Sequence, residues 1–121
     1  GTQTYTCGAD GVFGTASTPE AVLQSLDHPL NFIHHYAGPR WTFLRDKSTL
    51  LGTVVTRVDQ PGTIPWLLLS VVDEAPGYLD DIAYVTRVNT SGGTAPAGAC
   101  TPGATVAVPY SANYVFWEPR D

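Results

Sequence analysis

The sequence of 121 residues contains no methionine and few charged residues, which make up 14% of the chain. Lys and Arg number six against eleven Asp and Glu, so the net charge at neutral pH is -5. So few and so scattered basic residues do not make the positive surface that nucleic acid and anionic lipid require. No apolar run is long enough to cross a bilayer. We therefore expect neither a nucleic-acid partner nor membrane insertion.

Motifs of several enzyme classes are missing as well. No Gly-x-Gly-x-x-Gly pattern follows a strand and opens a helix, and no βαβ unit is available for a dinucleotide. No serine stands in Gly-x-Ser-x-Gly. The acidic residues at 73, 74, 80 and 81 lack the spacing of an EF-hand loop, so they are interpreted as a solvated turn. We assign no cofactor and no metal.

Cys7 and Cys100 are the only cysteines. Neither belongs to a Cys-x-x-Cys pair or has histidines at metal-site spacing around it, so a disulfide is the better interpretation. Two buried thiols in a cytosolic protein are the alternative. The disulfide and a composition rich in Thr, Ser, Gly and Pro favour an exported protein, secreted or in the cell envelope. We expect its signal peptide to be absent from this sequence.

Short β-prone segments separated by turn residues run along the chain, with no long helix and no repeat. Residues 21–26 fit either a short helix or a strand, and we favour the strand. Residues 64–72 are the most apolar run, which predicts a central strand covered on both faces. Gly52 marks a possible bulge. The sequence predicts one all-β domain over residues 1–121, an antiparallel sandwich or closed barrel of eight or nine strands. The expected strands are 2–7, 21–26, 30–36, 40–45, 50–58, 64–72, 82–89, 105–108 and 112–117.

The stretch from His34 to Trp41 is the leading candidate for a functional site. It places two imidazoles, a phenol, a guanidinium and an indole around an Ala-Gly-Pro bend. On a strand, His34 and His35 face opposite sides, so the two cannot easily chelate one ion together. His35 is the candidate general base or ligand contact. The alternative is a histidine hydrogen-bonded to the backbone at a strand end.

Arg87 and Asn89 form the second candidate, because alternation along residues 82–89 places both on one face. A guanidinium matches a planar carboxylate in two hydrogen bonds and can also contact a sugar. In the alternative interpretation, Arg87 pairs with Asp80, Asp81 or the terminal segment.

Aromatic side chains can line a pocket for an apolar ligand or stack on sugar rings, although most large aromatics belong to the core. Trp117 and Tyr110 are in this group together with Trp41, Trp66 and Tyr114. The predicted ligand-binding set is His35, Tyr36, Trp41, Trp66, Arg87, Asn89 and Tyr114.

Five ordered segments carry a resemblance: Gly1 to Cys7, His35 to Trp41, Ile64 to Leu68, Arg87 to Gly93, and Val108 to Tyr114. In these the sequence resembles a family of small exported domains of unknown function from bacteria, fungi and plants. Residues 46–48 depart from it, since the resemblance implies Asp-Gly-Ser where this chain has Asp-Lys-Ser. Some fungal relatives carry the name malate dehydrogenase, which these residues do not support. The resemblance supplies no catalytic residues.

Three functional hypotheses follow. The first is a disulfide-linked β domain that binds a small molecule or glycan near His35, Trp41, Arg87 and Asn89. The second is a small enzyme with His35 as general acid or base and Arg87 holding an anionic substrate. The third is a structural or envelope protein without a ligand. The identity of a ligand and the oligomeric state are not encoded in any pattern of this sequence.

Overall fold

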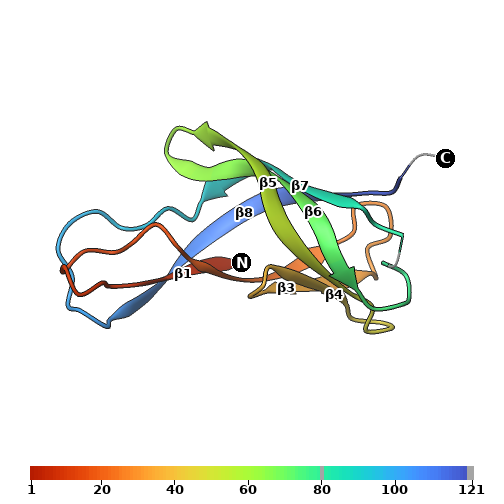
Figure 1. Cartoon of the computed structure of the whole chain (residues 1–121), viewed down its shortest axis with the longest axis horizontal. Helices are drawn as coiled ribbons and strands as arrows, with labels where there is room; N and C mark the ends of the chain where they lie inside the picture. Colours follow the sequence, from red (N-terminus) through yellow and green to blue (C-terminus); the bar gives the residue numbers. More distant parts are fainter. Residues whose placement is uncertain (80, 120–121) are drawn as a thin grey trace.

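The computed structural model describes residues 1–79 and 81–119, which form eight antiparallel strands (Figure 1). Each strand pairs with the next along the chain, and the last pairs with the first, so the sheet closes into a barrel. The all-β prediction is confirmed, and the barrel is the correct one of its two forms. The strands are β1 (Thr2–Thr6), β2 (Thr18–Gln24), β3 (Phe32–Tyr36), β4 (Arg40–Phe43), β5 (Thr49–Gln60), β6 (Thr63–Glu74), β7 (Tyr84–Gly92) and β8 (Thr105–Trp117).

The barrel interior is filled by side chains that alternate inward along the strands. The main cluster centres on Trp41, Leu50 and Val85, none of which is exposed to solvent. A smaller cluster surrounds Ile64 and Tyr110. The side chains of the two clusters hold β4 to β8 around a common interior. The candidate site lies where the clusters meet, between Trp41 of the first and Ile64 of the second.

Residues 18–24 form the strand β2 and not a helix, as we favoured. Ala21 is 5% exposed while its neighbour Val22 is 64% exposed, which is the period of two expected of a half-buried strand. In a helix, buried positions would recur every three to four residues and not at every second residue. The interior therefore receives Ala21 and Leu23 from this strand.

The register of β5 and β6 shifts between Leu51 and Gly52, which confirms the irregularity predicted at this glycine. The prediction that residues 64–72 are covered on both faces is wrong. Trp66 is 36% exposed and Val72 is 57% exposed, whereas Leu69 is buried. The outward face of β6 meets solvent because, among the described residues, no second layer packs outside the barrel.

The two strands predicted at 105–108 and 112–117 are one continuous strand, β8. Pro109 does not end it, because the strand exchanges partners at this position. Residues 105–109 pair with β1, and the pairing with β7 begins at Tyr110. Pro109 has no N–H to donate, but its carbonyl accepts a hydrogen bond from Gly93 N at 3.0 Å. The strand therefore keeps a backbone hydrogen bond at this position.

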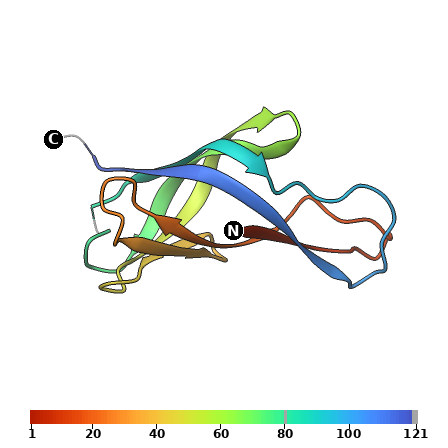
Figure 2. The same ribbon diagram turned by 180° about the vertical axis from the view of Figure 1, so that it is seen from behind.

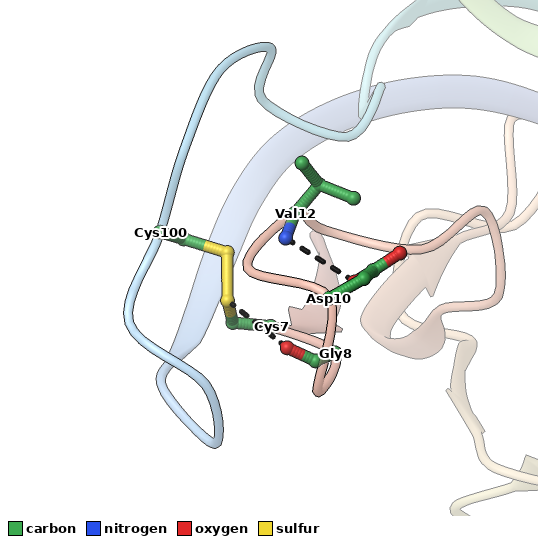
Figure 3. The surroundings of a disulfide bond; sticks show 5 residues. All are labelled: Cys7, Gly8, Asp10, Val12 and Cys100. Atoms are coloured by element: carbon green, nitrogen blue, oxygen red, sulfur yellow. Dashed lines mark hydrogen bonds between the residues drawn. A yellow bond between two sulfur atoms is a disulfide. The ribbon is translucent and has the colours of Figure 1, made fainter.

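Cys7 and Cys100 form the predicted disulfide, with 6.0 Å between their Cα atoms (Figure 3). Cys7 follows the last residue of β1, and Cys100 belongs to the segment between β7 and β8. Backbone hydrogen bonds flank the bridge, from Cys100 N to Gly11 O at 2.7 Å and from Cys7 N to Ala104 O at 2.7 Å. The bridge thus fastens two long connections at the end of the molecule remote from β3 and β4 (Figure 1).

Candidate functional site

A cavity of about 610 Å³ opens into the barrel interior and contains four of the predicted site residues. His35, Trp41, Arg87 and Tyr114 all line it, from strands β3, β4, β7 and β8. We call this space the Arg87 cavity. Its wall also includes residues 15–18, which precede and open β2, and the bend at residues 37–39.

His35 points into the Arg87 cavity and His34 points away from it, as the alternation predicted. His35 is 3% exposed, while His34 contacts the carboxylate of Glu20 on the outer surface. The Nδ1–H of His35 donates to the carbonyl of Arg40 at 2.9 Å, and this bond assigns the proton to Nδ1. The Nε2 atom of the neutral ring is then an acceptor, with no hydrogen bond to the described residues.

Burial lowers the pKa of His35 from 6.5 to about 4. The hydrogen bond to the Arg40 carbonyl opposes this shift in the pKa, and the positive charge of Arg87 adds to it. The imidazole is therefore neutral at pH 7. It presents a lone pair and not a positive charge.

Arg87 is 8% exposed, and its guanidinium is anchored at one point. Both Nε and Nη2 donate to the carbonyl of Pro65, at 3.1 and 2.8 Å. The pairing with Asp81 considered above does not occur, and Asp80 and residues 120–121 lie outside the described residues. Within residues 1–79 and 81–119, no carboxylate lies in ion-pair contact with Arg87. Arginine is always protonated in proteins, so the cavity is lined by a cation that has no counter-charge among the described residues.

Tyr114 lies opposite Arg87 across the β7–β8 pair. Its hydroxyl is hydrogen-bonded to that of Tyr110 at 2.9 Å. Burial raises the pKa of both phenols, so neither supplies a negative charge to balance Arg87.

Gln3 and Tyr5 also line the Arg87 cavity and were missed as site residues. Gln3 is 3% exposed, and its Oε1 accepts from Ser17 Oγ at 2.7 Å. The hydroxyl of Tyr5 donates to the carbonyl of Gly93. The alternation of these two residues with Thr2, Thr4 and Thr6 was the signal available in the sequence, because it places both on one face of a strand.

Three predicted site residues are not brought to the cavity. Tyr36 lies on the outer face, where its hydroxyl is hydrogen-bonded to Thr42 Oγ1 at 2.9 Å. Trp66 projects outward from β6 and does not line the cavity. Asn89 is exposed and does not share the environment of Arg87, because the β7–β8 register shifts after Val88 and Asn89 adopts a φ of 52°.

The acidic residues Asp73, Glu74 and Asp81 line a separate cleft of about 700 Å³ together with Glu118. In the described part of the chain, no group of three or more His, Cys, Asp or Glu side chains is arranged to hold a metal ion. No helix among the described residues is long and apolar enough to span a bilayer.

Comparison with known proteins places the chain in a family without a functional assignment. A search of curated proteins and a search of solved structures each found no match. A family model matches residues 24–118, which include seven of the eight strands in whole or in part. The match contains all four of the predicted residues that line the cavity, His35, Trp41, Arg87 and Tyr114. The chain belongs to the family described as protein of unknown function (DUF3455).

Proposed function

We propose that the barrel binds a small molecule bearing a carboxylate in the Arg87 cavity. One observation carries this proposal: Arg87 is 8% exposed, yet no described carboxylate contacts its guanidinium. A buried charge without a partner is costly, and a bound anion removes that cost. The ligand's carboxylate therefore supplies the counter-charge that the described part of the barrel lacks.

The two bonds to the Pro65 carbonyl fix the guanidinium plane before any ligand arrives. They occupy Nε and Nη2, and Nη1 makes no hydrogen bond to the described residues. Because the Arg87 side chain is already held in place, it loses little conformational entropy when a ligand binds, and this favours affinity for the ligand. Arg87 thus offers a carboxylate an oriented donor at Nη1.

His35 supplies the complementary group. Its Nδ1–H is already used by the Arg40 carbonyl, so Nε2 accepts a hydrogen bond from a ligand hydroxyl or N–H. The preferred ligand therefore combines a carboxylate with a hydroxyl group, as hydroxy acids and sugar acids do. The cavity volume of about 610 Å³ lies within the usual range for small-molecule sites.

The test is isothermal titration calorimetry with lactate and glucuronate, and with glucose as the uncharged control. We expect both acids to bind and glucose to bind at least about tenfold more weakly, the equivalent of one charge-assisted hydrogen bond. Arg87→Met keeps the length of the side chain and removes its charge, so it should abolish acid binding. Arg45→Met is the matched control, because Arg45 is exposed and does not line the cavity. Equal binding by the Arg87→Met protein would refute the proposal.

A second candidate function is catalysis with His35 as a general base. The observation that favours it is the neutral ring with a free Nε2 beside a cation that can hold an anionic substrate. Nuclear magnetic resonance of the same acids after long incubation tests it, since a new product must appear with wild type and be absent with His35→Gln. If neither binding nor turnover occurs and His35→Ala only lowers the melting temperature, these residues have a structural role alone.

A further inference from the structure

The wall of the barrel is incomplete where β1 begins. Residues 2–4 of β1 pair with residues 18–20 of β2, and residues 2–6 of β1 pair with residues 105–109 of β8. Beyond this point, in the described part of the chain, the second half of β2 pairs with β3 alone, and residues 111–117 of β8 pair with β7 alone. We call the space between these two half-strands the strand slot. Figure 2 shows the N-terminal end of β1, marked N, between the ribbons of β8 and β2.

The strand slot is a cleft between the side chains of the two half-strands. A space of about 710 Å³ is lined by residues 21–26 on one side and residues 110–116 on the other, with Gly1 at its near end. At Thr2 the distance between β2 and β8 is spanned by one strand, β1, which pairs with both. The near end of the slot is thus one strand wide.

The backbone of β8 is oriented to bind a strand in this slot. Gly1 N donates to Tyr110 O at 3.0 Å, and Tyr110 N donates to Gly1 O at 2.9 Å. Backbone groups alternate in direction along a strand, so those of Ala112, Tyr114 and Phe116 face the same way as those of Tyr110. The carbonyl of Trp117 accepts from Ala83 N on the opposite side at 2.8 Å, which fits this alternation.

The backbone of β2 faces the slot from the other side. Because Gly1 uses its groups on β8, Thr2 directs its own toward its partner Glu20. Val22 and Gln24 follow Glu20 at intervals of two, so their N–H and C=O groups also face the slot. Ser25 N donates to Asn31 O at 3.0 Å, away from the slot, as the same alternation requires.

We propose that the strand slot receives one extended polypeptide strand that is not part of these 121 residues. This strand runs in line with β1, antiparallel to both neighbours, and its last residue adjoins Gly1. Rows of N–H and C=O groups on two facing edges have no strand partner among the described residues, and such rows match a polypeptide backbone, as in other cases of strand addition. A second intact copy does not fit, because each of its strands is joined to neighbours in its own barrel.

The slot also defines the side chains of its occupant. Gly1 lies at an inward position, where an added Cβ would come within 2.4 Å of the Cβ of Ala21. Inward side chains of the occupant therefore alternate in phase with Gly1 and meet Leu23, Ala112 and Tyr114, which favours small apolar residues. Outward side chains lie beside the exposed Val22 and Val115. The occupant is a segment with small apolar residues at every second position.

The test uses the pentapeptide Thr-Val-Thr-Val-Thr, once fused directly ahead of Gly1 and once free with blocked ends. Fusion makes the binding intramolecular, so a low intrinsic affinity does not hide it. We expect hydrogen exchange at the amides of Val22, Gln24, Ala112 and Tyr114 to slow by at least about tenfold, because each gains a backbone partner. The amides of Asn113 and Val115, which face β7, should not change. The melting temperature of the fusion should rise by about 5 °C.

Two controls make the outcome decisive. Thr-Val-Pro-Val-Pro lacks the N–H groups that bond to β2 and should give neither protection nor a higher melting temperature. Val22→Pro removes an N–H that faces the slot and spares the pairing with β3, so it should reduce the protection given by Thr-Val-Thr-Val-Thr, whereas Val22→Thr should not. If neither the fused nor the free strand protects these amides, or if the proline control protects them equally, the proposal is overturned. This result is independent of acid binding in the Arg87 cavity.

Discussion

The imidazole of His35 lies nearly parallel to the indole of Trp41, with 4.6 Å between the ring centroids and 12° between the planes. The two residues are direct partners across β3 and β4, so the backbone register itself stacks them. Trp41 has no solvent exposure, and its buried Nε1 has no hydrogen-bond partner among the described residues. The orientation of the candidate base therefore depends on the packing of this indole as well as on the hydrogen bond to the Arg40 carbonyl.

Replacing Trp41 with alanine should lower the free energy of unfolding by about 3–5 kcal/mol, as expected when a large buried side chain leaves a cavity. It should also raise the pKa of His35 toward its ordinary value, because the ring becomes hydrated. Urea unfolding measures the first effect and a histidine titration by nuclear magnetic resonance the second. Trp117→Ala is the control, since that indole is 52% exposed and its loss should cost far less.

Gly52→Ala should destabilise the protein by about 1–3 kcal/mol through overpacking. A Cβ at this position would lie 2.9 Å from Cζ3 of Trp41, and the rigid, buried indole cannot move aside. Gly14→Ala is the matched control, because a Cβ there meets nothing within 4 Å. A Gly52→Ala protein with unchanged thermal stability would show that β5 can shift away from Trp41.

Proton binding at His35 in the unfolded chain should lower the free energy of unfolding in mild acid. Above pH 6.5 the ring is neutral in the folded and unfolded chains, so it adds nothing to the pH dependence. Between pH 6.5 and about 4 the unfolded chain binds a proton at His35 that the folded chain excludes, and stability falls as the pH falls. The loss at His35 between pH 7 and pH 4 should be about 3 kcal/mol.

Urea unfolding across this pH range measures the loss, with His35→Asn as the variant that cannot titrate. Its stability should fall less steeply with acid than that of wild type. His34→Asn is the control for a histidine on the outer surface, and it should leave most of the acid sensitivity in place. Parallel pH curves for wild type and His35→Asn would contradict the prediction.

Reduction of the disulfide should lower stability by about 4 kcal/mol in the chain-entropy model, because Cys7 and Cys100 are 93 residues apart in sequence. The Cys7→Ser, Cys100→Ser double variant should show the same loss without reductant, and adding reductant to it should have no effect. Thermal unfolding with and without dithiothreitol makes the comparison.

Lys47→Gly should stabilise the protein by about 1 kcal/mol. Lys47 has a φ of 64°, a left-handed conformation that costs a residue with a Cβ roughly 1–2 kcal/mol and costs glycine almost nothing. The neighbouring hydrogen bonds from Ser48 N and Oγ to Asp46 hold the turn and should be retained. Lys47→Ala separates the two contributions, because it removes the charge and keeps the strained Cβ. Chemical denaturation of the three proteins in parallel measures the difference.

The sequence predicted the features that depend on the alternation of side chains along a strand and on the number of cysteines. The opposite orientations of His34 and His35, the strand predicted at 21–26, which forms at 18–24, and the irregularity at Gly52 each follow from local chemistry. The disulfide follows from the presence of two cysteines without a metal-site pattern around them. The family resemblance had already implied a glycine in the turn where Lys47 now adopts a positive φ. Apart from the disulfide, these features could be predicted because each depends on near neighbours in the chain.

The rest required knowledge of which strands meet. Asn89 left the face of Arg87 because of a register shift between β7 and β8, and no property of residues 82–89 reveals that shift. The sequence predicted two strands at 105–108 and 112–117, whereas the structure has one strand that changes its partner near Pro109. Gln3 entered the Arg87 cavity because β1 closes the barrel against β8. Barrel closure is a long-range property, and it decided which candidate residues share one cavity.

The three indoles stand in three different environments, which gives the protein a built-in set of optical reporters. Trp41 is fully buried, Trp66 is 36% exposed and Trp117 is 52% exposed. Iodide in solution should quench the emission of the two outer indoles and leave that of Trp41 untouched. A Trp66→Phe, Trp117→Phe protein would therefore fluoresce from a single indole in contact with His35, and its emission would follow protonation and occupancy of the cavity without any added label.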